Sequence, residues 1–149
     1  MKNLGISLSL TFICIFVLLL NSTQAGGTHG SLVVTIEGFS NSEGYAMVAV
    51  FDSEKAYKEG SPKTAKAKVE VTDQKALVIF DDLKYGTYAV ASFHDQNANG
   101  KMDKNFLGIP KESYGHSNNV RGSFGPPSFD KAKIDFGSPE KQIKIKLEQ

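Results

Sequence analysis

The chain has 149 residues, 40% of them hydrophobic, and its 17 basic residues nearly balance its 16 acidic ones. This composition excludes the basic excess of a nucleic-acid-binding domain, and the length suffices for one domain with a sizeable core. Among the first 25 residues, Lys2 is the only charged side chain. A 15-residue apolar run extends from Ile6 to Leu20 and is followed by small and polar residues that end at Ala25. The pattern predicts a secretory signal peptide over residues 1–25.

Cleavage after Ala25 would leave a chain of zero net charge without cysteine, because Cys14 is the only cysteine in the sequence. The apolar run is shorter than the roughly 20 residues of a membrane-spanning helix. We therefore expect a secreted or periplasmic protein without disulfides, without a nucleic-acid partner and without stable membrane insertion after cleavage. Residues 26–30 are expected to form a flexible N-terminus, followed by one domain over residues 31–149.

Apolar and polar residues alternate with period two along this domain, and Gly, Pro, Asn and Asp bound the segments, which predicts strands. The segment 45–51 is apolar on both faces and predicts a central strand, whereas 52–60 has the cap residues of one short helix. Ile143, Ile145 and Leu147 are expected to face the core from an edge strand. Seven strands without a long helix predict an all-β fold, a single antiparallel β-sandwich. The expected strands are 32–36, 45–51, 68–72, 76–80, 88–93, 131–136 and 142–147.

Two resemblances support this fold. Phe80, Leu83, Gly86, Tyr88 and Val90 follow the F-x-x-L-x-x-G-x-Y-x-V pattern, which resembles transthyretin-like (prealbumin-like) sandwiches and implies a transthyretin- or immunoglobulin-like arrangement. From about Leu32 to the C-terminus, the chain also resembles a family of exported bacterial proteins, domain of unknown function 2141. That resemblance implies a signal peptide followed by a small β-sandwich, and no particular activity. The residues that carry it are Phe93, His94, Asp95, Asn97, Asn99, Gly100, Asp103, Asn105, Gly108, Ile109, Pro110, Glu112, Tyr114, Gly115, Ser117, Asn118 and Asn119.

Residues 95–128 have no strand pattern and are rich in Gly and Pro, which predicts a long irregular lobe at one end of the sandwich. We expect the aromatic residues Phe106, Tyr114 and Phe124 to fasten this lobe to the core. Loops on a rigid β scaffold are the usual place for binding sites. The lobe is expected to present four polar side chains to an unknown ligand or protein partner: Tyr114, Asn118, Asn119 and Arg121.

The start of the lobe matches part of a calcium-binding loop. Position 12, where a bidentate Glu belongs, is Phe106, so about two ligands are missing unless Glu112 or Asp130 supplies them. The competing interpretation is a polar turn, in which the Asp and Asn side chains accept hydrogen bonds from nearby backbone amides. We expect weak Ca²⁺ binding as the cofactor interaction. The expected ligands are Asp95, Asn97, Asn99, Lys101 through its carbonyl, and Asp103, with Gly100 at the bend.

The sequence patterns that indicate catalysis are weaker than the calcium-loop pattern. Arg121-Gly122-Ser123 resembles the tail of the transthyretin-like hydroxyisourate hydrolases, but here Val120 precedes it and further strands follow. The alternative to a binding function is therefore a hydrolase of that class using His94, His116 and Arg121. His94 shares its strand parity with buried positions, which favours a hydrogen-bonded histidine over a ligand or a base. The sequence favours a noncatalytic binding module.

Overall fold

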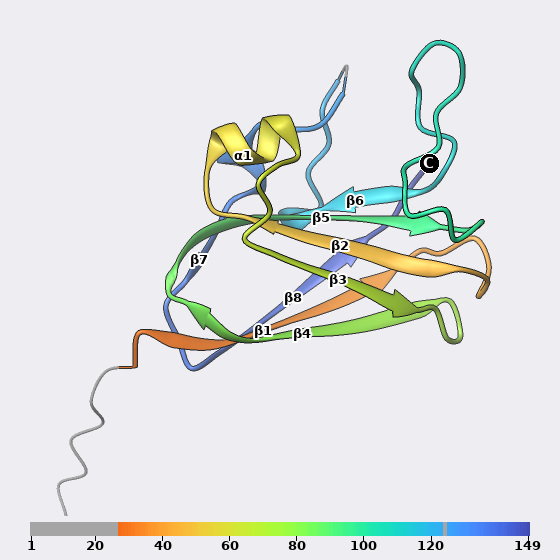
Figure 1. Cartoon of the computed structure of the whole chain (residues 1–149). Coiled ribbons are helices and arrows are strands. Elements are labelled where there is room, and N and C mark those ends of the chain that lie inside the picture. Colours follow the sequence, from red (N-terminus) through yellow and green to blue (C-terminus); the bar gives the residue numbers. More distant parts are fainter. Residues whose placement is uncertain (1–26, 124) are drawn as a thin grey trace, which may run out of the picture.

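A computed structural model describes residues 27–123 and 125–149, and the predicted signal peptide and Phe124 lie outside them. Two sheets face each other (Figure 1), one of three strands in the order β4-β1-β8 and one of five strands with the path β3-β2-β5-β6 and β7 beside β5. The all-β sandwich is confirmed. Its elements are β1 His29–Glu37, β2 Tyr45–Phe51, α1 Glu54–Glu59, β3 Ala65–Glu70, β4 Lys75–Lys84, β5 Gly86–Asp95, β6 Tyr114–His116, η1 Ser117–Asn119, α2 Phe129–Ala132, β7 Ile134–Phe136 and β8 Glu140–Lys146.

The core forms where the alternating apolar side chains of the two sheets meet. Along β1 and β8 the buried positions are those that the period-two pattern indicates, and Ile145 is completely buried. β2 lies between β3 and β5, as predicted for a central strand. The main members of the core are Leu32, Val34, Ile36, Val48, Val50, Val78, Phe80, Tyr88, Val90, Phe136, Ile145 and Leu147.

A second, smaller apolar cluster covers the outer face of the five-stranded sheet. The helix α1 lies over this face (Figure 1) and buries Ala56 and Tyr57 against Phe51 and Ala89. Its ends follow the sequence pattern, because Ser53 Oγ accepts a hydrogen bond from the Ala56 N–H and Gly60 closes the helix in the left-handed conformation. Together, the two clusters explain why β2 is apolar on both faces.

The structure differs from the sequence prediction in four respects. The strand β1 begins at His29, within the segment expected to be flexible, and residues 131–132 of the expected strand 131–136 belong to the helix α2. The sandwich is not wholly antiparallel, since β8 runs parallel to β1 with Ile145 beside Ile36. The segment 95–128 is not wholly irregular either, because β6 lies within it and pairs with β5. Three residues are too short to produce a visible alternation, and their partner strand is distant in sequence. Within residues 27–123 and 125–149, no helix has the length and apolar character needed to cross a bilayer.

The strand β6 also joins the two sheets at one edge. Tyr114 and Glu148 exchange two backbone hydrogen bonds of 3.0 Å, which tie β6 to the residues after β8. At Gly115 the backbones come so close that an added Cβ would lie 2.6 Å from the Lys146 carbonyl oxygen. Glycine is therefore required where β6 crosses β8.

Candidate functional site

The first turn of the lobe is built around Asp95, the last residue of β5, whose side chain is completely buried. Its Oδ1 accepts a hydrogen bond of 3.0 Å from the Asn99 N–H, and its Oδ2 accepts one of 2.8 Å from the Gly100 N–H. Gly100 has a φ of 76°, which favours glycine at this bend. The carboxylate of Asp95 thus holds the turn that the D-x-N-x-N-G pattern predicts.

The predicted metal ligands beyond Asp95 gather around Asp103. Asn97 Nδ2 donates to Asp103 Oδ2 at 2.6 Å, and Asn99 Nδ2 donates to Asp103 Oδ1 at 3.1 Å. The backbone N–H of Lys101 donates to Asn99 Oδ1 at 2.8 Å. Residues 27–123 and 125–149 contain no group of three His, Cys, Asp or Glu side chains placed to hold a metal ion. The predicted ligands are therefore close together, in a network that satisfies its own hydrogen bonds.

Glu112 follows this loop in the chain and binds it through two hydrogen bonds. Its side chain is 5% exposed, and its two carboxylate oxygens accept hydrogen bonds from the N–H groups of Gln96 (3.1 Å) and Asp103 (3.0 Å). Asp130, the other residue considered as an extra ligand, lies on α2 and pairs with Lys133 Nζ at 2.7 Å. Of the two candidates, only Glu112 reaches the loop.

His94 and His116 point to opposite faces of the five-stranded sheet. His116 is paired with Ala91 across β5 and β6, whereas His94 has the opposite parity on β5. His94 is completely buried in the core, where Nε2 lies 2.7 Å from the Glu43 carbonyl oxygen. The prediction of a hydrogen-bonded core histidine is correct. The proposed hydrolase set of His94, His116 and Arg121 does not converge, because the sheet separates His94 from the other two.

His116 instead lies at a small cavity of about 140 Å³ where β6, η1 and the chain after β8 meet. The His116 side chain is 8% exposed, its Nδ1 is 2.7 Å from the Tyr57 hydroxyl, and its Nε2 has no partner among the described residues. Burial lowers the pKa of His116 to about 4 and raises the pKa of Tyr57 to about 12. The cavity is lined by Tyr114, Gly115, His116, Asn119, Val120, Arg121, Lys146 and Glu148.

The contact with Tyr57 determines which nitrogen of the His116 ring carries the hydrogen. The Tyr57 hydroxyl has no other hydrogen-bond acceptor within the described residues, so its hydrogen is satisfied only when it donates to His116 Nδ1. The neutral ring then carries its own hydrogen on Nε2. This makes Nε2–H a buried donor without an acceptor, an arrangement that costs about 1–3 kcal/mol unless a ligand or water completes it.

Three of the four predicted ligand-binding residues line this cavity: Tyr114, Asn119 and Arg121. Arg121 Nε forms an ion pair of 2.8 Å with Glu148. Asn118 does not belong to the group, since its Nδ2 donates to the carbonyl oxygens of Lys131 and Lys133 and so fastens α2. The contribution of Tyr57 was missed, because nothing in the sequence links a helix residue to a histidine 59 positions later.

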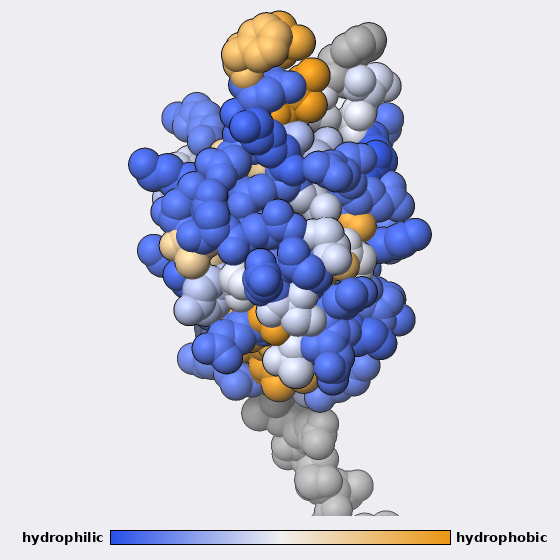
Figure 2. Space-filling model, turned by 90° about the vertical axis from the view of Figure 1, so that its right-hand side faces the viewer, coloured by the Kyte–Doolittle hydropathy of each residue, from blue (hydrophilic) through white to orange (hydrophobic). Residues whose placement is uncertain are grey.

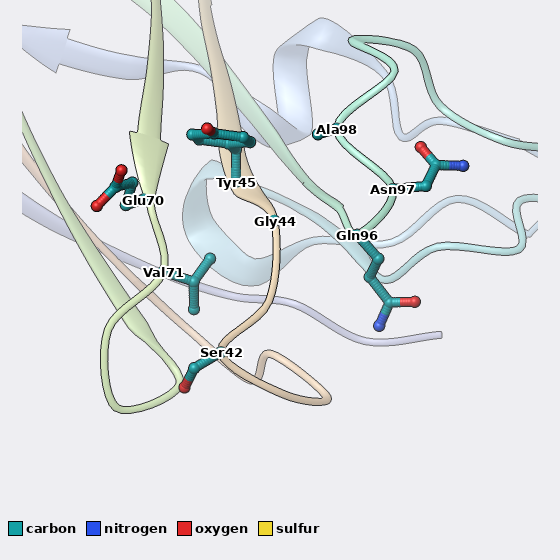
Figure 3. Close-up of a pocket in the computed structure, with 8 residues that line it drawn as sticks. All are labelled: Ser42, Gly44, Tyr45, Glu70, Val71, Gln96, Asn97 and Ala98. Atoms are coloured by element: carbon teal, nitrogen blue, oxygen red, sulfur yellow. The ribbon is translucent and has the colours of Figure 1, made fainter.

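A second, wider hollow of about 320 Å³ lies beside the first turn of the lobe (Figure 3). Its polar side chains do not converge. In Figure 3 the amide of Asn97 points away from Tyr45 and Glu70, and it is engaged with Asp103. The Gln96 amide is likewise engaged, with Ser40. It is lined by Ser42, Gly44, Tyr45, Glu70, Val71, Gln96, Asn97 and Ala98.

Comparison with known proteins gives a family assignment. Residues 34–144 match the family model DUF2141, described as an uncharacterized protein conserved in bacteria. No curated protein and no solved structure matched. The matched residues span most of both sheets, the whole lobe and most of the His116 cavity. The chain therefore belongs to the DUF2141 family of bacterial proteins.

Proposed function

We propose that the protein is a noncatalytic, exported binding module that holds a small ligand with an acceptor oxygen, such as a carboxylate, in the His116 cavity. The observation that carries the proposal is the buried Nε2–H of His116, which has no partner among the described residues and belongs to a residue that lines the cavity. Arg121 and Lys146 add positive charge at the same cavity, although Glu148 pairs with both. An oxygen acceptor would complete the histidine and gain from the two cations.

The size of the cavity limits the ligand. Pockets for drug-sized molecules usually measure about 300–1,000 Å³, and one water takes about 30 Å³ of liquid. A cavity of about 140 Å³ has room for a small group and not for a whole large molecule. We infer that it takes the terminal carboxylate or carbonyl of a ligand whose remainder lies outside.

A noncatalytic role is supported by what surrounds His116. Its neighbours in the described structure are the Tyr57 hydroxyl and aromatic rings, and Ser117 beside it donates to backbone oxygens of Val90 and Ala132. A nucleophile needs a base within hydrogen-bond reach. Ser117 is instead committed to fastening β5 to α2. The hydroxyl that does contact His116, that of Tyr57, is a poor nucleophile, because burial raises its pKa to about 12. Export to a secreted or periplasmic location is proposed on the predicted signal peptide and the cysteine-free mature chain.

The ligand proposal predicts that acetate shifts the side-chain NMR resonances of His116 at about pH 7. A ligand of four heavy atoms gains at most about 6 kcal/mol, so the dissociation constant should be about 4 × 10⁻⁵ M or higher, and the titration should reach about 50 mM. His94 is an internal control, because it is buried in the core away from the cavity. Methylammonium chloride, which offers no acceptor oxygen, is the matched small ion.

We expect acetate to move His116 and spare His94, and Arg121→Gln to weaken the effect. Equal shifts at both histidines would show a general salt effect, and unchanged His116 resonances at the highest acetate concentration would contradict the proposal. Asn118→Ala is the neighbouring control variant, since Asn118 lies beside the cavity residues in sequence but outside the cavity.

We further propose that Ca²⁺ binds weakly to the Asp95 loop. The support is that the side-chain amides of Asn97 and Asn99 both donate hydrogen bonds to the carboxylate of Asp103. A cation could occupy the positions beside this carboxylate that the two N–H donors now take. A cation would replace those donors and turn the amide oxygens inward. With few carboxylates, the site belongs with extracellular calcium modules of about 10⁻⁴–10⁻³ M affinity.

Calcium at ten times its dissociation constant is expected to raise the free energy of unfolding by about 1.4 kcal/mol. Asp103→Asn should abolish this gain, and Lys101→Ala should keep it, since the Lys101 side chain is exposed. Asp95→Ala is a poor test, because it would also remove the acceptor of two backbone amides. A calorimetric titration to about 10 mM Ca²⁺ without heat, together with an unchanged melting temperature, would leave the loop a polar turn.

A further inference from the structure

The outermost part of the lobe is an apolar tip, defined here as residues 106–110. The prediction that Phe106 fastens the lobe to the core is wrong: its side chain is 95% exposed, and Leu107 and Ile109 are 67% and 55% exposed. The loop stands away from both sheets beyond β6 (Figure 1). Figure 2 shows hydrophobic surface gathered at this end of the molecule, above a mostly hydrophilic body. Contiguous exposed apolar side chains of this kind mark an interaction surface.

Three of the four backbone N–H groups of the apolar tip have acceptors within the loop. Asn105 Oδ1 accepts hydrogen bonds from the N–H groups of Leu107 (2.9 Å) and Ile109 (3.0 Å), and the Asn105 carbonyl accepts one from Gly108. Pro110 has no N–H to satisfy. Unsatisfied amides are the main cost of placing a loop in a medium of low polarity, because no water is there to bind them. These three N–H groups keep their acceptors when the tip leaves water.

Positive charge surrounds the apolar tip. Lys101, Lys104 and Lys111 are exposed on the two arms of the loop, and Asp103 is the only acidic residue within residues 96–111. This segment has a net charge of +2, three lysines against one aspartate, although the expected mature chain is neutral overall. An overall neutral protein thus has one end that is both apolar and cationic.

We propose that the apolar tip inserts reversibly into the interface of an anionic lipid bilayer, with Lys101, Lys104 and Lys111 at the headgroups. The charge of the loop complements anionic lipid, and lysines beside inserted apolar side chains are the usual composition of a peripheral membrane anchor. The tip is a protrusion and not a groove, so it fits a soft planar surface. This contact is independent of the His116 cavity and differs from a spanning segment, since only a few side chains leave water.

The test uses Phe106→Trp in the exported protein. The sequence contains no tryptophan, so the introduced indole would be the only such reporter, and an exposed position should accept it without disturbing the fold. We expect its fluorescence to shift to the blue with vesicles of phosphatidylcholine and phosphatidylglycerol at a ratio of about 7:3, and lipids brominated in the chains to quench it. Vesicles of phosphatidylcholine alone should bind much more weakly.

Two sets of variants separate the contributions. In vesicle co-sedimentation, each lysine near an anionic surface contributes about fivefold to binding. The double variant Lys104→Gln, Lys111→Gln should therefore bind anionic vesicles about 25-fold more weakly. Phe106→Ser should reduce it roughly tenfold or more. Leu77→Ser with Ile79→Ser is the matched control, because these residues are exposed to 56% and 52% on β4, away from the loop. The control pair should bind as the parent protein does.

Two results would overturn the proposal. One is an indole emission of the Phe106→Trp variant that anionic vesicles leave unchanged. The other is a blue shift that rises with protein concentration in the absence of lipid and accompanies dimer formation in sedimentation, since the tip would then contact a second copy of the chain.

Discussion

Replacing Ile145 by alanine is expected to lower the free energy of unfolding by about 2–5 kcal/mol. Ile145 is completely buried on β8, beside Ile36 of β1, and its Cγ2 lies against Gly115 of β6. Truncation would leave a cavity where the two sheets are joined, and the glycine backbone cannot move in to fill it without losing the Tyr114–Glu148 pairing.

Lys144→Ala is the matched control on the same strand. Its side chain is exposed and pairs with Glu37 at 3.4 Å, so the loss should stay below about 1 kcal/mol. Urea denaturation of both variants measures the difference. Similar losses for the two would mean that the inward and outward positions of β8 are assigned the wrong way round.

Acidification from pH 6.5 to about 4 is expected to destabilise the protein through His116. Burial lowers the pKa of its ring from 6.5 to about 4, so in this window the unfolded chain binds a proton that the folded chain does not. Stability is therefore present above pH 6.5 and is lost as the pH falls toward 4, by about 3 kcal/mol in total. Tyr57 and Tyr114 contact the ring, and the charged groups that line the same cavity are Arg121, Lys146 and Glu148.

The measurement compares unfolding free energies of the parent protein and His116→Gln at about pH 7 and about pH 4.5. The variant will be less stable at both values, but its loss on acidification should be smaller by about 2–3 kcal/mol, because it has no imidazole to protonate. Other titrating groups contribute to both proteins and cancel in the difference. Identical pH slopes would show that His116 is readily protonated in the folded state.

The sequence predicts most of the sandwich, since alternation along β1, β4 and β8 reflects burial on one face and the apolar run of β2 reflects its cover on both faces. It also predicts α1, whose cap residues act within a few positions of each other. What it cannot reveal are contacts between distant segments. The parallel pairing of β8 with β1 and the short β6 depend on partners far away in the chain, and neither produces a local pattern.

The same distinction holds for the sites. The turn at Asp95 is local, so D-x-N-x-N-G predicts it correctly. In contrast, Asn118 is a polar loop residue like Asn119, and only the position of α2 gives it a structural role. Phe106 is a further example, because an aromatic residue in a loop suggests an anchor whether it turns toward the core or toward solvent.

The pairing of the last strand with the first has a consequence for when the protein can fold. β1 lies between β4 and β8, and without residues 140–147 one edge of β1 is unpaired and the core lacks Ile145 and Leu147. A chain that emerges from its N-terminus cannot complete this sheet until residues 140–147 have been made, and closing so long a loop makes folding slow. Late completion delays folding during synthesis, as the proposed export across a membrane would require.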